Sequence, residues 1–284
     1  MLPRAGVDLI IDAALEEDVS LGDITTDGLV PRELTGRASF VVKAHGVLAG
    51  MEVALRVFQR VDPALQGRVL VADGSPVAPG VVVGEAMGPV AAILRAERTA
   101  LNLLTRMSGI ATETARYVQA VEGFTCQILD TRKTVPGLRL LDKYAVRMGG
   151  GRNHRYHLGD GVLVKDNHWE ALKRAGITLA QGLEGLRGRV HHLIRIQVEV
   201  KDMAELSEAI GAGADVLLLD NMSPEEMAVA VKKVGGRLPL EASGGISLKT
   251  VRRVAQSGVD FISIGALTHS PGALDISLEL EYQA

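Results

Sequence analysis

The sequence predicts an α/β protein, in which a small α+β layer precedes a parallel sheet that is either open or closed into a barrel. In the first third of the chain, short β-like runs are separated by turn residues. Residues 92–121 then keep the apolar spacing of one long helix. Beyond this helix, short apolar runs alternate with amphipathic stretches, which is the pattern of repeated strand-then-helix units.

The N-terminal layer is expected to contain two helices and a small sheet. Residues 7–17 show helical spacing, with apolar positions on one face and acidic positions on the other, and a second helix is expected at 53–61. Runs at 38–42, 68–71 and 81–83 are rich in β-branched residues and predict the strands.

The remainder of the chain is expected to contain about six strands, where a complete α/β barrel has eight. Gly109 weakens the middle of the long helix, and Gly123 fits its end. Helical stretches are expected at 203–211, 224–234 and 248–258. The predicted strands lie at 127–129, 162–164, 196–200, 216–219, 238–240 and 261–264.

Composition excludes several classes of protein. The 284 residues are 47% hydrophobic and 23% charged, with a formal net charge of −3, which argues against a general nucleic-acid or membrane-surface binder. No apolar run approaches the ~20 residues that span a bilayer, and the N-terminus lacks the pattern of a signal peptide. The single cysteine, Cys126, suits a reducing compartment and is expected to be buried. We therefore expect a soluble, cytoplasmic protein.

Polar and charged residues stand at or just beyond the end of each predicted strand. Parallel α/β sheets place their binding sites at the carboxyl ends of strands, so six such ends in succession predict an active site there. The segments are Asp130-Thr131-Arg132-Lys133, Lys165-Asp166-Asn167-His168, Glu199 to Lys201, Asp220-Asn221, Glu241 to Gly245, and Gly265-Ala266.

Three groups of residues suggest the chemistry. Ser243-Gly244-Gly245 and Gly265-Ala266 offer backbone N–H groups that suit a phosphate, although either segment alone would also suit a tight turn. Glu199 and Asp220 suit Mg²⁺ held through water or a developing positive charge, and pairing with nearby cations is an equally open alternative.

The third group is a cluster of cations in a chain that is acidic overall. Such a cluster suits carboxylates and phosphates, although an ordinary basic surface is the alternative, and His154 taken alone could be a satisfied core histidine. Its members are Arg132, Lys133, Arg147, Arg152, His154, Arg155 and Lys165.

Four motifs in order resemble quinolinate phosphoribosyltransferase (nicotinate-nucleotide pyrophosphorylase, carboxylating). The resemblance runs from about Glu16 to the C-terminus, and the Asp-Thr-Arg-Lys-Thr and His-Arg blocks are its most specific parts. The motifs are Glu97 to Asn102 with Ser108 to Thr112, Asp130 to Arg139, Gly149 to Gly151 with Asn153 to Arg155, and Lys165 to His168.

The resemblance implies a fold and an activity. The fold is an incomplete, about seven-stranded α/β barrel with an N-terminal α+β sandwich domain. The sandwich would span 1–108 and be joined by 271–284, while the barrel would span 109–270. The activity is transfer of ribose 5-phosphate from PRPP to quinolinate with loss of pyrophosphate and CO₂, giving nicotinate mononucleotide. Mg²⁺ would accompany PRPP, and homodimers or larger oligomers would share sites between subunits.

The resemblance also implies roles for individual residues. Arg98 looks like an arginine borrowed by the neighbouring subunit, and Lys133 lies near both substrates. Lys133, Glu199 and Asp220 are the expected catalytic residues, with the two acids also near the metal. The expected substrate-binding set is Arg98, Thr131, Arg132, Lys133, His154, Arg155, Lys165, Glu199, Asp220, Ser243, Gly244, Gly245, Ile264, Gly265, Ala266 and His269.

Two alternatives stay open at this point. A paralogue of the same fold could act on nicotinate or be a molybdenum-associated relative. A non-catalytic protein that binds phosphate sugars belongs to a different class. Changing Lys133 or Glu199 to Ala would separate the two, because only an enzyme would lose turnover with binding largely kept.

Overall fold

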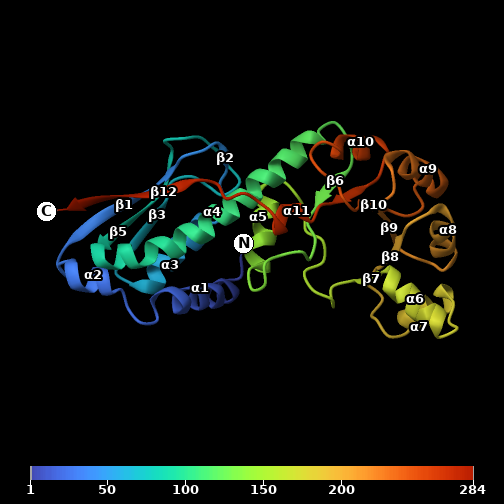
Figure 1. Cartoon of the computed structure of the whole chain (residues 1–284), viewed down its shortest axis with the longest axis horizontal. Coiled ribbons are helices and arrows are strands. Elements are labelled where there is room, and N and C mark those ends of the chain that lie inside the picture. The colour runs from blue at the N-terminus through green and yellow to red at the C-terminus, as the bar shows by residue number, and fades with distance from the viewer. Residues whose placement is uncertain (1, 284) are drawn as a thin grey trace. The chain divides into compact units, whose positions relative to one another are not determined.

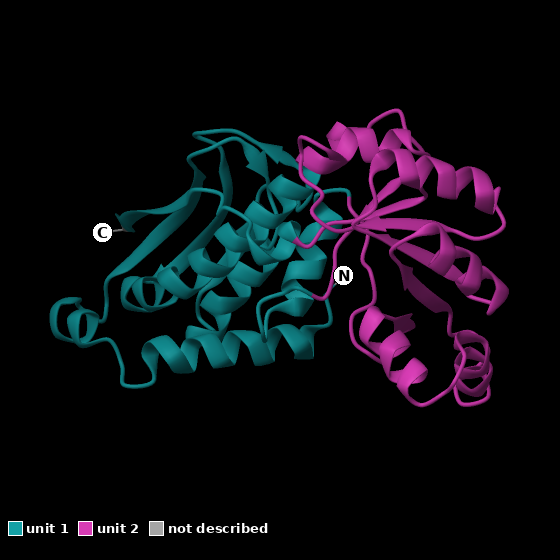
Figure 2. Cartoon of the chain, turned by 45° about the vertical axis from the view of Figure 1, so that its right-hand side comes forward, with its two compact units in different colours: residues 1–115, 133–150, 266–284 teal, residues 116–132, 151–265 magenta. Residues whose placement is uncertain are grey.

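The structure, a computed structural model, describes residues 2–283 and divides into two compact units (Figure 2). Unit 1 comprises residues 1–115, 133–150 and 266–284, and unit 2 comprises residues 116–132 and 151–265. Together they contain the predicted α+β layer and the predicted parallel sheet, so the α/β fold class is confirmed.

Unit 1 is built on an antiparallel sheet with the strand order β12-β1-β5-β3 (Figure 1). Strand β12 (Ile276–Gln283) pairs with β1 (Thr35–Val42) along its whole length, so the C-terminal segment completes a sheet that the N-terminal residues begin. Strand β5 (Val82–Pro89) pairs with β1 and with β3 (Gln66–Val69). Two short strands, β2 (Gly46–Val47) and β4 (Pro76–Val77), form a separate pair.

Helices of unit 1 bury apolar residues next to this sheet. Phe58, on one of these helices, meets Phe40 of β1 edge to face, with ring centroids 5.6 Å apart. Gly109 of the long helix is required by packing, because a Cβ there would lie 2.0 Å from the Gly272 carbonyl oxygen. The helices are α1 (Arg4–Val19), α2 (Ile24–Leu29), α3 (Met51–Val61), α4 (Val90–Ala120), α5 (Arg139–Met148) and α11 (Ala266–His269), and α4 runs on into unit 2.

Unit 2 is built on a six-stranded sheet with the order β6-β11-β10-β9-β8-β7, and all of its pairings are parallel. At its β6 edge, Arg152 forms an isolated parallel bridge with Leu129. Six strands and this bridge are therefore found among the described residues, where about seven strands were expected. The strands are β6 (Gln127–Leu129), β7 (Val162–Val164), β8 (Ile196–Val200), β9 (Val216–Asp220), β10 (Leu240–Ser243) and β11 (Phe261–Ser263).

The register divides this sheet into an apolar face and a polar face. Side chains alternate along each strand, and Val198 pairs with Leu217 while Ala242 pairs with Leu219, so these fully buried residues share one face. Helices cover that face, with α8 beside β8 and α10 beside β11. The helices of unit 2 are α6 (Asp166–Arg174), α7 (Leu179–Arg187), α8 (Met203–Gly211), α9 (Pro224–Val234) and α10 (Val251–Gln256).

The opposite face carries the polar residues of the strands. By the same alternation it presents Gln197, Glu199, Asp220, Glu241 and Ser243. Glu199, Asp220 and Ser243 lie at or next to the carboxyl ends of their strands, whereas Gln197 and Glu241 lie one step deeper. No helix among residues 2–283 is long and apolar enough to cross a membrane.

Candidate active site

Asp130 anchors the loop that follows β6. Its carboxylate is fully buried, with Oδ1 accepting the His154 backbone N–H at 2.8 Å and Oδ2 accepting the Asn153 side-chain amide at 2.6 Å. The Asp130 N–H in turn donates to the Arg152 carbonyl at 3.1 Å. The segment 152–154 is thereby fixed at the end of β6.

The guanidinium groups of Arg132 and Arg155, both in unit 2, repel each other at this end of the sheet. The pKa of Arg155 is lowered, first by burial and then by the positive charge of Arg132, with the Asp160 carboxylate opposing the effect. The Arg155 Nη1 donates to the Gly161 carbonyl at 2.7 Å, and the Arg132 Nε is buried without a hydrogen-bond partner in the described part of the chain. Partly buried guanidinium groups that repel each other are stabilised by an anion with more than one negative charge.

The His154 ring points toward Gln197 and Glu241 on the polar face of the sheet. Its Nε2 lies 3.1 Å from Gln197 Oε1 and 3.5 Å from Glu241 Oε2, and its Nδ1 accepts the Arg155 backbone N–H at 2.8 Å. Both ring nitrogens therefore have partners within the chain, which is the geometry of a satisfied core histidine. The ligand role predicted for His154 would require one of these hydrogen bonds to open.

Lys165 and Glu199 lie at the ends of the neighbouring strands β7 and β8. Lys165 is exposed at the start of α6, where its backbone N–H donates to His168 Nδ1 at 2.8 Å. The pKa of Glu199 is raised, first by burial and then by the nearby charge of Asp220, and Lys165 opposes the rise. Glu199 also lines a polar pocket with Lys201 at the end of β8.

Glu199 and Asp220 fit a magnesium ion in chemical type. Both offer carboxylate oxygens, the ligands that Mg²⁺ prefers, and two mutually repelling carboxylates are stabilised by a cation. Asp220 also accepts the Asn221 side-chain amide at 2.9 Å. No group of three or more His, Cys, Asp or Glu residues suited to a metal occurs within residues 2–283. A two-carboxylate site suits an ion that keeps several waters and binds substrate phosphates.

The loop after β10 has the backbone that the phosphate prediction requires. Gly244 and Gly245 adopt φ of +96° and +58°, and a Cβ on Gly244 would lie 2.2 Å from Asn221 Oδ1. Only glycine fits such a position without strain, and it leaves the backbone open to a ligand. Ile264 differs from the prediction in one respect, because its N–H donates to the Leu129 carbonyl at 2.9 Å and so serves the sheet.

Of the other predicted residues, Thr131 and Gly265 belong to unit 2, and the rest belong to unit 1. Arg98 lies exposed on α4, Lys133 has an exposed side chain, and Ala266 and His269 bound the short helix α11. His269 Nδ1 lies 2.6 Å from Ser270 Oγ.

A buried network supports these positions within unit 1. Thr268 of α11 donates its hydroxyl to the Lys133 carbonyl at 2.8 Å, and its own carbonyl accepts from Arg106 at 3.1 Å. Arg106 also binds the fully buried Asp142 of α5 through two hydrogen bonds of 2.9 and 2.8 Å.

Comparison with known families identifies the chain. The family described as quinolinate phosphoribosyl transferase matches twice, with its N-terminal domain over residues 23–108 and its C-terminal domain over residues 110–279. The chain belongs to the quinolinate phosphoribosyltransferase family. The assignment made from the sequence motifs is therefore confirmed.

Individual relatives of the quinolinate phosphoribosyltransferase family agree with this assignment. A probable nicotinate-nucleotide pyrophosphorylase [carboxylating] of Synechocystis is 42% identical over 280 residues, covering 96% of this chain and 93% of the relative. The crystal structure of NadC from Streptococcus pyogenes superposes with a TM-score of 0.94 at 38% identity, covering 100% of this chain and 99% of that one. Human nicotinic acid phosphoribosyltransferase, at 14% identity and a TM-score of 0.63, shares the fold alone.

Neither Gln197 nor Glu241 was in the predicted catalytic or substrate-binding set, although Glu241 begins one of the predicted strand-end segments. Both are buried, and Gln197 Nε2 donates to Glu241 Oε2 at 2.8 Å. The available signal was a polar or charged residue inside an otherwise apolar strand, which a folded protein buries only with partners.

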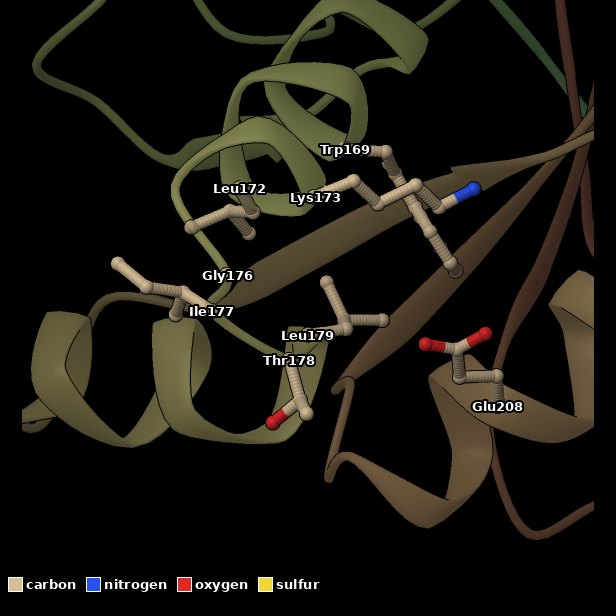
Figure 3. Close-up of a pocket in the computed structure, with 8 residues that line it drawn as sticks. All are labelled: Trp169, Leu172, Lys173, Gly176, Ile177, Thr178, Leu179 and Glu208. Carbon is tan, nitrogen blue, oxygen red and sulfur yellow. The ribbon is translucent and has the colours of Figure 1, made fainter.

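One pocket of unit 2 contains none of the predicted residues (Figure 3). It lies among α6, α7 and α8, and the Trp169 Nε1 beside it is buried without a hydrogen-bond partner in the described residues. Its lining residues are Trp169, Leu172, Lys173, Gly176, Ile177, Thr178, Leu179 and Glu208.

Proposed function

We propose that the chain transfers ribose 5-phosphate from PRPP to the ring nitrogen of quinolinate. Pyrophosphate and CO₂ are released, and nicotinate mononucleotide is formed for de novo NAD biosynthesis in the cytoplasm. The observation that carries this proposal within the quinolinate phosphoribosyltransferase family is the pair of partly buried guanidinium groups of Arg132 and Arg155, whose mutual repulsion a dianionic substrate would relieve.

The arginines and Lys165 bind and orient the dicarboxylate in this proposal. Arginine forks match the planar carboxylates, and the lysine adds a point charge. Holding both carboxylates aims the ring nitrogen at C1 of the ribose, and orientation of this kind lowers the barrier substantially. The same positive charges stabilise the carbanion left on the ring when the 2-carboxylate departs.

Glu199 and Asp220 face the ribose and the metal in this proposal. Mg²⁺, when bound with PRPP, supplies positive charge to the leaving pyrophosphate. Displacement of pyrophosphate builds oxocarbenium-like charge on the ribose, which the two carboxylates stabilise. Burial and mutual repulsion raise the pKa of Glu199, and both a cation and a developing positive charge favour its ionised form.

The loop Ser243-Gly244-Gly245 is proposed to hold the 5-phosphate. The positive φ values of the two glycines expose backbone N–H groups, and Ser243 adds a hydroxyl. Family resemblance adds Thr131, Gly265, Ala266 and His269 as further contacts and Lys133 as a catalytic residue.

An assay of PRPP with quinolinate and with nicotinate side by side tests the activity. We expect release of CO₂ and pyrophosphate with quinolinate, and turnover of nicotinate alone would overturn the proposal. The Arg155→Lys variant should raise KM for quinolinate about tenfold or more, since a bidentate contact is lost. The exposed Arg189→Lys variant is the matched control and should leave it unchanged.

Sharing of the site between subunits is a separate proposal that rests on the exposed Arg98. Arg98→Ala and Lys165→Ala subunits should each be inactive alone, and mixed dimers should recover part of the activity because one of their two sites is intact. Absence of any recovery, with mixed dimers shown to form, would contradict the sharing.

A further inference from the structure

Glu241 is a buried carboxylate on the polar face of the sheet in unit 2. Its side chain is on β10, and the residue is only 3% exposed. Oε2 accepts from Gln197 Nε2 at 2.8 Å and lies 3.5 Å from His154 Nε2, while Oε1 has no hydrogen-bond partner in the described part of the chain. A carboxylate so buried is costly to the fold unless its partners are well placed, so its position requires a reason.

The hydrogen bonds around Glu241 form one directed chain. The Arg155 backbone N–H donates to His154 Nδ1 at 2.8 Å, so that nitrogen must carry a lone pair. The other ring nitrogen then carries the proton and donates to Gln197 Oε1 at 3.1 Å. The Gln197 amide donates onward to Glu241 Oε2. Each group is held in a single orientation by the next, and the chain ends on a carboxylate, which can only accept.

We propose that Glu241 is a positioning residue, which acts through Gln197 and His154 to hold the backbone of Arg155 and hence the guanidinium that binds the substrate. An acceptor at the far end of the chain fixes the amide of Gln197, and the fixed amide selects the His154 tautomer. A carboxylate that orients a histidine from behind is a general way of fixing ring orientation and tautomer. This inference rests on the proposed function for its substrate, whereas the tautomer of His154 does not depend on it.

The charge on Glu241 agrees with this role. Burial by itself would raise the pKa of the carboxyl group, but its polar neighbours, His154 first and then Gln197, outweigh burial and leave the pKa below its ordinary value. The group is therefore ionised at neutral pH and cannot donate a proton back along the chain.

The test combines a spectroscopic readout with kinetics. In the wild-type protein, the ¹⁵N shifts of His154 should report a neutral ring with its proton on Nε2. In Glu241→Gln, a mixture of tautomers is expected, together with a rise of about tenfold in KM for quinolinate, while kcat and KM for PRPP stay within about twofold. Gln197→Met breaks the same chain at its middle and should reproduce both effects, so the test stands if Glu241→Gln fails to fold.

The change in the His154 tautomer and the rise in KM for quinolinate also allow this inference to be tested separately from the proposed function. The Glu241→Gln/Gln197→Met double variant should be no worse than the more affected single variant, because both act through one chain. An unchanged His154 tautomer in both folded single variants would overturn the inference. The inference would also be overturned if kcat fell and the KM values for quinolinate and PRPP both rose by a similar factor, since only a general structural defect acts that way. If the wild-type protein does not turn over quinolinate, the proposed function fails, and the tautomer shift alone decides the positioning role.

Discussion

Replacing Arg106 by alanine should destabilise unit 1, because it leaves the buried Asp142 carboxylate without its ion-pair partner. Asp142 has no exposed side-chain surface, and Arg106 binds both of its oxygens while remaining 24% exposed itself. Burial raises the pKa of Asp142, and Arg106 is the principal group that opposes this rise. Without Arg106, the carboxylate keeps a hydrogen bond of 3.4 Å from the Val135 backbone N–H.

The expected loss in the free energy of unfolding follows from this geometry. Breaking a buried ion pair by removing one partner costs about 3–5 kcal/mol, and the partial exposure of Arg106 places the expected loss near the lower end, at about 3 kcal/mol. For a chain of this size, each kcal/mol lowers Tm by about 2 °C or slightly more, so Arg106→Ala should lower Tm by about 6 °C or more. The Lys133 segment should also loosen, because Arg106 holds the Thr268 carbonyl.

Thermal unfolding followed by circular dichroism measures the effect, with a surface pair as the matched control. Arg60 binds Asp12 with the same two-bond geometry, at 2.7 Å for each bond, but both side chains are well exposed. Arg60→Ala should therefore cost less than about 1 kcal/mol. The double variant Arg106→Met/Asp142→Leu should recover much of the loss, because no charge is left buried. Equal losses at Arg60 and Arg106, or no recovery in the double variant, would refute the reasoning.

Two further predictions concern the site. Gly244→Ala should raise KM for PRPP about tenfold or more, because the added Cβ would clash with Asn221. Gly236→Ala is the control: this glycine also has a positive φ, but there is open space around it, so the variant should leave KM for PRPP unchanged. The raised pKa of Glu199 means that kcat/KM should fall with decreasing pH from a higher pH than an ordinary carboxyl group would give. In Asp220→Asn the negative charge that raises the pKa of Glu199 is removed, so the residual activity should fall at a lower pH than in the wild-type protein. A pH profile that is unchanged, or that shifts to higher pH, would contradict this.

The sequence predicted the parts of the fold that depend on local periodicity. Expected strands at 127–129 and 162–164 match β6 and β7, and the expected helix at 92–121 matches α4 within two residues at its start. Strand ends were informative because parallel strands carry their terminal residues to one edge of a sheet, whatever the loops between them do.

Tertiary contacts decided what the sequence could not show. Helix α5 was not expected, because its ten residues mix charged and apolar positions, and the charged residues Asp142 and Lys143 are buried. The inward direction of the His154 ring was also hidden, since it depends on Gln197 and Glu241, two positions far away in the chain. Sequence spacing identified the residue types at the site, but long-range partners determined which atoms face a ligand.

The pairing of β12 with β1 has a consequence for how the chain is made. Residues 35–42 leave the ribosome long before residues 276–283, and until the latter emerge, β1 is an open edge strand with free backbone groups. All of unit 2 is synthesised in that interval, because it ends at residue 265. The nascent chain therefore carries an unpaired strand edge through much of its synthesis, and edges of this kind favour association between chains.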